Sequence, residues 1–134
     1  LEHYSNDAST LVQFNQAKIY VDGIVSLRTG AVIDAYQNRP GEFGFEYFTN
    51  AETLNSISIT LARNGFQLHY HATGDRSARL SLDAIEAVNN ALPNSTAGPH
   101  RITHCYLIDP SDRSRFSELG AYADFQVPLT TQTE

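Results

Sequence analysis

The chain has 134 residues, a formal net charge of −6 and 41% hydrophobic residues. We expect this length and composition to give a single folded domain over residues 1–134. Because the chain is acidic, with scattered Lys and Arg residues and no long apolar run, the sequence argues against nucleic-acid and membrane partners.

The first predicted element is a strand over residues 17–21 that stops at the turn signal Asp22-Gly23. An irregular leader over residues 1–16 precedes it. Residues 26–48 show no period and contain glycine and proline breakers, so we expect a long loop. A loop of this length in a compact domain is usually functional, and we place it over the expected site.

A helix is predicted next. Thr49 and Glu52 have the spacing of a capping box. Gly65 is typical of the residue that ends a helix. The apolar residues between them recur at helical spacing and predict the buried face: Leu54, Ile57 and Leu61.

The segment from Gly65 to Asp75 is predicted to be a short strand that runs directly into a second helix. Apolar and polar residues alternate in it, and this alternation places His69 and His71 on one face of the strand. We expect Asp75 to be the N-cap of the second helix. The apolar face of that helix is formed by Ala78, Leu82, Ile85, Val88 and Leu92.

A third strand is predicted over residues 100–106, and Asp109-Pro110 marks the start of a third helix. Phe116 and Leu119 are expected to face inward from that helix. A further strand is predicted over residues 121–127. Strands that alternate with helices in this way predict parallel strands with right-handed crossovers, and therefore an α/β fold.

Histidines lie at or near the carboxyl ends of two predicted strands, His71 on the second and His104 on the third. The carboxyl ends of parallel strands are where α/β proteins usually carry their chemistry, and neighbouring strands lie about 4.8 Å apart. Two imidazoles at these ends could share one metal ion. Neutral imidazole is a ligand that zinc and other first-row metals prefer, so we expect a divalent transition metal, with zinc favoured.

Other polar residues lie near this expected site. Lys18 is in an otherwise apolar strand, where it is either a solvated edge residue or a functional group. Asp22 and Asp75 follow strands, and they could orient the metal ligands or simply cap turns. We expect His69 to support the ligands from deeper in its strand rather than to bind metal itself.

Three residues are expected to have no catalytic function. Cys105 lies in an apolar context that predicts a buried residue rather than a reactive thiol. His100 is expected to be structural or exposed, and His3 lies in the polar leader.

A single cysteine also excludes an internal disulfide and suits a reducing, cytoplasmic location. Because the chain begins at Leu1 and contains no methionine, we expect it to be part of a longer protein.

Three segments, in order along the chain, resemble blocks of the family-3 amidohydrolases, a group of metal-dependent hydrolases that includes N-substituted formamide deformylases. The third segment is similar to the family's Arg-Ile-Glu-His-x-x-Leu block, with Thr103 in place of the glutamate. The segments are Lys18-Ile-Tyr-Val-Asp22-Gly23, His71-Ala-Thr-Gly-Asp75-Arg-Ser-Ala and His100-Arg-Ile-Thr-His104-Cys-Tyr-Leu.

The resemblance implies a (β/α)8 TIM barrel, of which this chain would form about strands four to seven. It also implies that Lys18, His71 and His104 bind metal, that the lysine can be carboxylated, and that a metal-activated water hydrolyses an amide-type C–N bond in a small molecule. The family's first-strand His-x-His pair and its last-strand aspartate have no counterpart in this chain. We therefore expect the chain alone to be inactive or nearly so.

Two alternatives remain open from the sequence. The chain could be a non-catalytic half-barrel module that binds a partner or a metal, and half a barrel would expose two sheet edges through which two copies could pair. It could also be a different α/β hydrolase or transferase in which the histidines at the strand ends are coincidental. The second alternative lacks a nucleophile elbow, a Walker loop or a dinucleotide glycine pattern.

Overall fold

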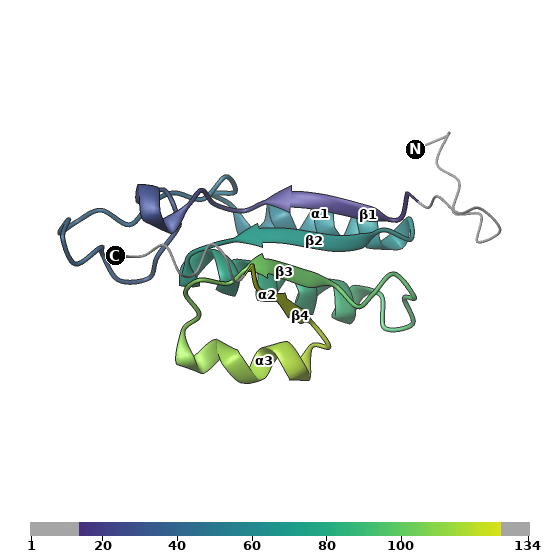
Figure 1. Ribbon diagram of the computed structural model, residues 1–134. Helices are drawn as coiled ribbons and strands as arrows, with labels where there is room; N and C mark the ends of the chain where they lie inside the picture. The colour runs from purple at the N-terminus through teal and green to yellow at the C-terminus, as the bar shows by residue number, and fades with distance from the viewer. Residues whose placement is uncertain (1–13, 127–134) are drawn as a thin grey trace.

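A computed structural model of the chain describes residues 14–126, and these residues form a four-stranded sheet with its helices (Figure 1). All three strand pairings are parallel and the strand order is β1-β2-β3-β4, which confirms the predicted α/β fold. The elements are β1 Gln16–Tyr20, η1 Val25–Leu27, α1 Ala51–Arg63, β2 Gln67–Ala72, α2 Asp75–Ala91, β3 Arg101–His104, η2 Pro110–Asp112, α3 Arg113–Glu118 and β4 Tyr122–Asp124.

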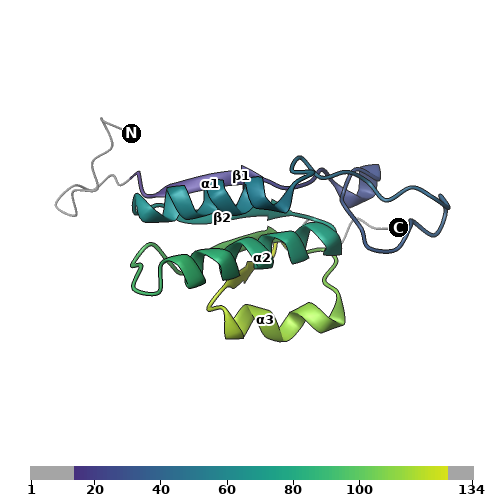
Figure 2. The same cartoon turned by 180° about the vertical axis from the view of Figure 1, so that it is seen from behind.

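Helices α1 and α2 cover one face of the sheet, as the view from behind shows (Figure 2). The core lies between these helices and the apolar side chains of the strands. Its largest fully buried residues include Leu68, Tyr70 and Ile102 from the strands and Leu82 and Ile85 from α2. In the part of the chain that the structure describes, no helix covers the opposite face of the sheet.

The strand register decides which residues are neighbours on the uncovered face. Lys18 of β1 is opposite His69 of β2, and Tyr20 is opposite His71. On the other side of β2, His71 is opposite Thr103, whereas His104 is opposite Ala72. His71 and His104 are therefore not register partners. Because side chains alternate between the two faces of a strand, a regular backbone would place these two side chains on opposite faces of the sheet.

The start of α1 differs from the predicted capping box. The N-cap is Asn50, whose side-chain oxygen accepts a hydrogen bond of 2.7 Å from the backbone N–H of Glu52, so the assignment of the cap to Thr49 was wrong. The C-terminal prediction is confirmed, because Gly65 follows the helix with a φ of +84°, a conformation that glycine adopts without steric cost.

The buried face of α1 also differs from the prediction. Leu54 is buried as expected, but Ile57 is 38% exposed, and the buried residues of the helix are Leu54, Ser58 and Ala62. Ser58 can lie in the core because its hydroxyl accepts a hydrogen bond from the buried Tyr70 hydroxyl at 2.8 Å. A polar residue satisfied in this way cannot be recognised from apolar spacing alone.

Helix α2 begins one residue earlier than expected. Gly74 is its N-cap, and Asp75 is its first helical residue, so the prediction that Asp75 is the N-cap was wrong. The Asp75 carboxylate accepts hydrogen bonds of 2.9 Å from the backbone N–H groups of Ile33 and Arg76. The predicted apolar face of α2 is confirmed, with Ala78, Leu82, Ile85 and Val88 buried and Leu92 partly buried.

The last elements agree with the predicted order. Pro110 begins a 3-10 turn that leads into α3, and the Asp109 side chain accepts a hydrogen bond from Ser111 N–H. Phe116 and Leu119 pack against the core. Strand β4 is shorter than predicted, and residue 127, like His3 and most of the expected leader, lies outside the described residues. Within residues 14–126, no helix is both long and apolar enough to cross a membrane.

Candidate functional site

His71 and His104 lie beside each other at the carboxyl ends of β2 and β3. Their ring centroids are 4.4 Å apart and the rings are inclined at 69°. His71 is buried, and the ring of Tyr20 on β1 lies 4.8 Å away from it on the other side. The structure therefore brings together the two histidines that were predicted from the sequence to share a site.

The hydrogen bonds of these histidines leave nitrogen lone pairs available. His71 Nε2 lies 2.8 Å from the carbonyl oxygen of Gly23. A carbonyl can only accept, so Nε2 carries the proton and Nδ1 keeps its lone pair. His104 Nδ1 is buried and has no hydrogen-bond partner within the described residues. A histidine that donates one N–H to a backbone carbonyl and a second one with a buried, unpaired nitrogen fit a metal ion.

Electrostatics favour the neutral form of His104. Burial lowers the pKa of its imidazole, and the neighbouring His71 and Lys18 lower it further. A neutral imidazole presents a lone pair at ordinary pH, and this is the form that binds metal ions. Among residues 14–126, however, no three His, Cys, Asp or Glu side chains are grouped as a metal site. Two imidazoles alone are an incomplete ligand set for zinc.

Lys18 contacts His69 rather than His71. Its Nζ lies 3.2 Å from His69 Nε2, and burial is the main cause that lowers its pKa. His69 Nε2 also contacts the Thr103 hydroxyl, which lies 3.3 Å from the carboxylate of Asp124 on β4. These four side chains form a polar row across all four strands. Asp124 was missed by the sequence analysis, although it is the one acidic residue in the predicted last strand.

Asp22 is the most extensively hydrogen-bonded side chain near the site. It is 1% exposed, and its Oδ2 accepts from two hydroxyls and three backbone N–H groups. The donors are Ala31 N, Thr73 N, Thr73 Oγ1, Gly74 N and Ser77 Oγ, at 2.6–3.2 Å. Its Oδ1 is 3.8 Å from His71 Nε2. Asp22 therefore joins the end of β1, the following loop and the first turn of α2.

The long loop is fastened to α2 by further contacts, so it is an ordered part of the site region. Besides the bond to Asp75 already described, the carbonyl of Ala31 accepts a bond of 3.1 Å from Arg76 N–H. A side chain at Gly74 would lie 1.9 Å from that carbonyl oxygen, so the approach requires glycine. The loop lies beyond the carboxyl ends of the strands (Figure 1).

His100 has a structural contact, as predicted. It is buried, and its Nδ1 accepts a hydrogen bond of 3.1 Å from Leu68 N–H. Cys105 is also buried, and burial raises the pKa of its thiol to about 12, so the thiol is protonated at ordinary pH. This agrees with the prediction that Cys105 is not a catalytic nucleophile.

His69 gives a testable pH dependence. Burial, together with the charges of Lys18 and Arg101, lowers its pKa from 6.5 to about 4. The unfolded chain therefore binds this proton at a higher pH than the folded protein does. We expect the thermal unfolding midpoint of the metal-free protein to fall as the pH decreases from about 6.5 to about 4. The His69→Gln variant should show a smaller decrease of the midpoint. An equal decrease would contradict the lowered pKa of His69 as the cause.

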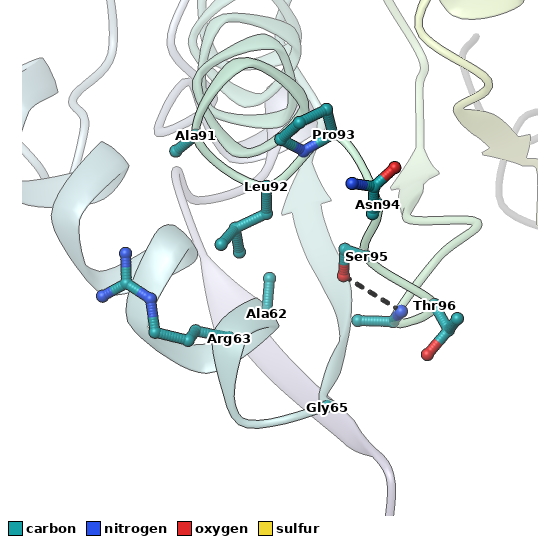
Figure 3. A pocket seen from close by; sticks show the side chains of 10 residues that line it. Ala62, Arg63, Gly65, Ala91, Leu92, Pro93, Asn94, Ser95 and Thr96 are labelled. Carbon is teal, nitrogen blue, oxygen red and sulfur yellow. Dashed lines mark hydrogen bonds between the residues drawn. The ribbon is translucent and has the colours of Figure 1, made fainter.

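A pocket of about 430 Å³ lies at the opposite end of the sheet (Figure 3). It is formed where α1 ends and where the loop after α2 leads into β3. Its lining includes Ala62, Arg63, Leu92, Ser95 and Thr96, and no histidine. The pocket is therefore separate from the paired histidines and is not part of the candidate site.

Comparisons with known proteins identify the family of this chain. The model of the Amidohydrolase family matches residues 1–134. The Arabidopsis thaliana protein LONG AFTER FAR-RED 3 is 27% identical over 109 residues, which are 81% of this chain and 18% of that protein. The putative amidohydrolase YtcJ of Bacillus subtilis is 27% identical over 115 residues, which are 86% of this chain and 21% of that protein.

Two solved structures share the fold. An uncharacterized metal-dependent hydrolase from Pyrococcus horikoshii OT3 has a TM-score of 0.77 and 23% identity, over 92% of this chain and 24% of that chain. A second one, from Pyrococcus furiosus, has a TM-score of 0.76 and the same identity and coverage. The chain spans about a fifth of the length of the curated relatives it matches. Because the family model matches the whole sequence, the chain belongs to the amidohydrolase family.

Proposed function

We propose that this chain forms part of the active site of a metal-dependent hydrolase that cleaves an amide-type C–N bond in a small molecule. The observation that carries the proposal is the pair of histidines, His71 and His104, whose rings lie 4.4 Å apart at the ends of neighbouring parallel strands. Two structural neighbours are described as metal-dependent hydrolases, which supports a metal requirement. The family membership supports hydrolysis.

We propose zinc as the metal, held by His71, His104 and Lys18. When bound, zinc would supply an acidified water as the nucleophile and polarise the bond to be cleaved. The Gly23 carbonyl fixes the proton of His71 on Nε2, so its other nitrogen is free to bind. Burial lowers the pKa of Lys18, so its amine is neutral at a lower pH than usual. A neutral amine favours the carboxylated lysine as a metal ligand over a solvated cation.

Residues behind the ligands keep the site in place. We propose that His69 holds the amine of Lys18, that Asp22 holds the loop carrying Gly23, and that Asp75 attaches the long loop to α2. None of these three residues would bind the metal. They would exclude alternative rotamers of the groups that do.

We further propose that the chain is a single domain equivalent to strands four to seven of a (β/α)8 barrel. Among the described residues, helices cover only one face of the sheet (Figures 1 and 2). The other face carries polar side chains such as Lys18, His69 and Thr103. The interior of a barrel is the expected place for such residues near the carboxyl ends of the strands. The length of the curated relatives leaves room for the remaining strands.

The first test is the metal content of the purified full-length protein, measured by elemental analysis. We expect zinc at about one ion or more per chain, and loss of hydrolysis of N-substituted amides after chelation, with recovery on addition of zinc. Protein purified without any transition metal, and unable to bind one on titration, would contradict the proposal.

A second candidate is a non-catalytic half-barrel module that forms homodimers through its sheet edges. Within the described residues, β1 and β4 are edge strands, and Tyr20 and Tyr122 on them are 57% and 61% exposed. Exposed edges and aromatic side chains favour association. Light scattering and elemental analysis of the 134-residue chain distinguish the two candidates. A dimer without metal supports the module, and a chain that binds metal supports the hydrolase.

A further inference from the structure

The position of His104 cannot be explained by a regular strand. In β3, the buried residue Ile102 faces the helices, and side chains alternate along a strand. His104 is two residues after Ile102 and is the register partner of the fully buried Ala72. A regular extended backbone would therefore place the imidazole of His104 on the helix side, away from His71.

The backbone changes at this point, and the imidazole reaches the other face. His104 has a φ of +84° and Cys105 a φ of +46°, both in the left-handed region that residues other than glycine rarely adopt. As a result the His104 ring lies 4.4 Å from that of His71, on the face opposite the core. Strained backbone of this kind commonly occurs at functional sites, where the surrounding structure maintains it.

Backbone hydrogen bonds hold the chain directly after the turn, where Cys105 is packed in the core. Its side chain is buried in the core, and its thiol donates a hydrogen bond to the carbonyl of Ile102 at 3.3 Å. Its N–H bonds to the carbonyl of Ala72 at 3.1 Å, and Leu107 N–H bonds to Thr73. The chain therefore returns to its pairing with β2 directly after the turn, with Cys105 instead of His104 packed in the core.

We propose that Cys105 is a positioning residue, because its small side chain, unbranched at Cβ, permits the left-handed turn that directs His104 to the metal site. The inference rests on the proposed function for its consequence, the metal affinity, but not for the geometry itself. Cysteine suits the position because it is small, apolar and unbranched at Cβ, so it fills the core without preventing a positive φ. A β-branched residue of similar polarity would favour an extended backbone.

The test compares Cys105→Val with Cys105→Gly in the full-length protein. Valine disfavours a positive φ, whereas glycine allows it but removes the packed side chain. We expect Cys105→Val to lower the affinity for Co²⁺, titrated into metal-free protein, by about 10–100-fold. Cys105→Gly should keep the affinity within about threefold even where its unfolding temperature is lower. This difference separates positioning from stability.

Crystal structures of the wild-type, Cys105→Val and Cys105→Gly proteins give the second readout. We expect the His104 ring to leave His71 in the valine variant and to stay beside it in the glycine variant. Unchanged ring positions and affinity in Cys105→Val would overturn the proposal, as would an equal loss of affinity in Cys105→Gly. A wild-type protein that binds no Co²⁺ would instead refute the proposed function, and the ring positions would then decide on Cys105.

Discussion

Replacement of either His71 or His104 by alanine is expected to remove the metal from the protein, with a loss of affinity of at least about a hundredfold. The two imidazoles lie on adjacent strands with ring centroids 4.4 Å apart, so one ion would bind both of them. Removal of one ring leaves too few ligands for tight binding by the other. The measurement is elemental analysis of each purified variant, followed by zinc titration of metal-free protein.

His100→Ala is the matched control for these variants. His100 precedes β3 at its amino end, and His104 is the last residue of the same strand. The buried ring of His100 bonds to Leu68 N–H, so its removal should lower stability without affecting metal binding. If His104→Ala keeps its full metal content, the two histidines do not share an ion. If His100→Ala also loses the metal while it remains folded by circular dichroism, the site has been misplaced.

The sequence predicted the parts of the fold that follow from local patterns. The alternation in the second strand correctly separated Leu68 and Tyr70, which are fully buried, from His69 and His71 on the other face. The turn at Asp22-Gly23 ended the first strand within one or two residues. These features can be predicted because the spacing of apolar residues within one element decides which of its faces is buried.

The features that the sequence did not predict depend on contacts between distant segments. Ser58 lies in the core because Tyr70, on a different element, donates a hydrogen bond to it. His104 reaches the site only through two successive residues with positive φ, and nothing in its local sequence marks that turn. Equivalent places for His71 and His104 were predicted from their positions at strand ends, yet in the register they are offset by one residue.

Asp22 shows the same limitation, because the sequence suggested a turn residue or a support for metal ligands and the structure shows the centre of a buried network. Its Oδ2 accepts five hydrogen bonds, all of them from residues at least nine positions away. The carboxylate also lies at the N-terminus of α2, where a negative charge is favourable. An isolated Asp-Gly turn signal contains no information on such donors.

Replacement of Asp22 by alanine is expected to lower the free energy of unfolding by about 3–5 kcal/mol. The variant leaves buried N–H and hydroxyl groups of Ala31, Thr73, Gly74 and Ser77 without their acceptor, and each unsatisfied donor costs about 1–3 kcal/mol before the structure relaxes. Urea unfolding followed by circular dichroism measures the change. Asp34→Ala, which alters an exposed aspartate of the same loop, should stay within about 0.5 kcal/mol of the wild type.

Asp22→Asn distinguishes the charge of this residue from its shape. The amide keeps the size of the carboxylate, but it replaces one acceptor oxygen by an NH₂ group that must face N–H donors whichever way it is oriented. We therefore expect most of the loss seen with alanine, and a weaker affinity for zinc because the loop that carries Gly23 no longer holds His71. Full stability in Asp22→Asn would mean that the donors find water instead, and that the network around Asp22 does not order the site.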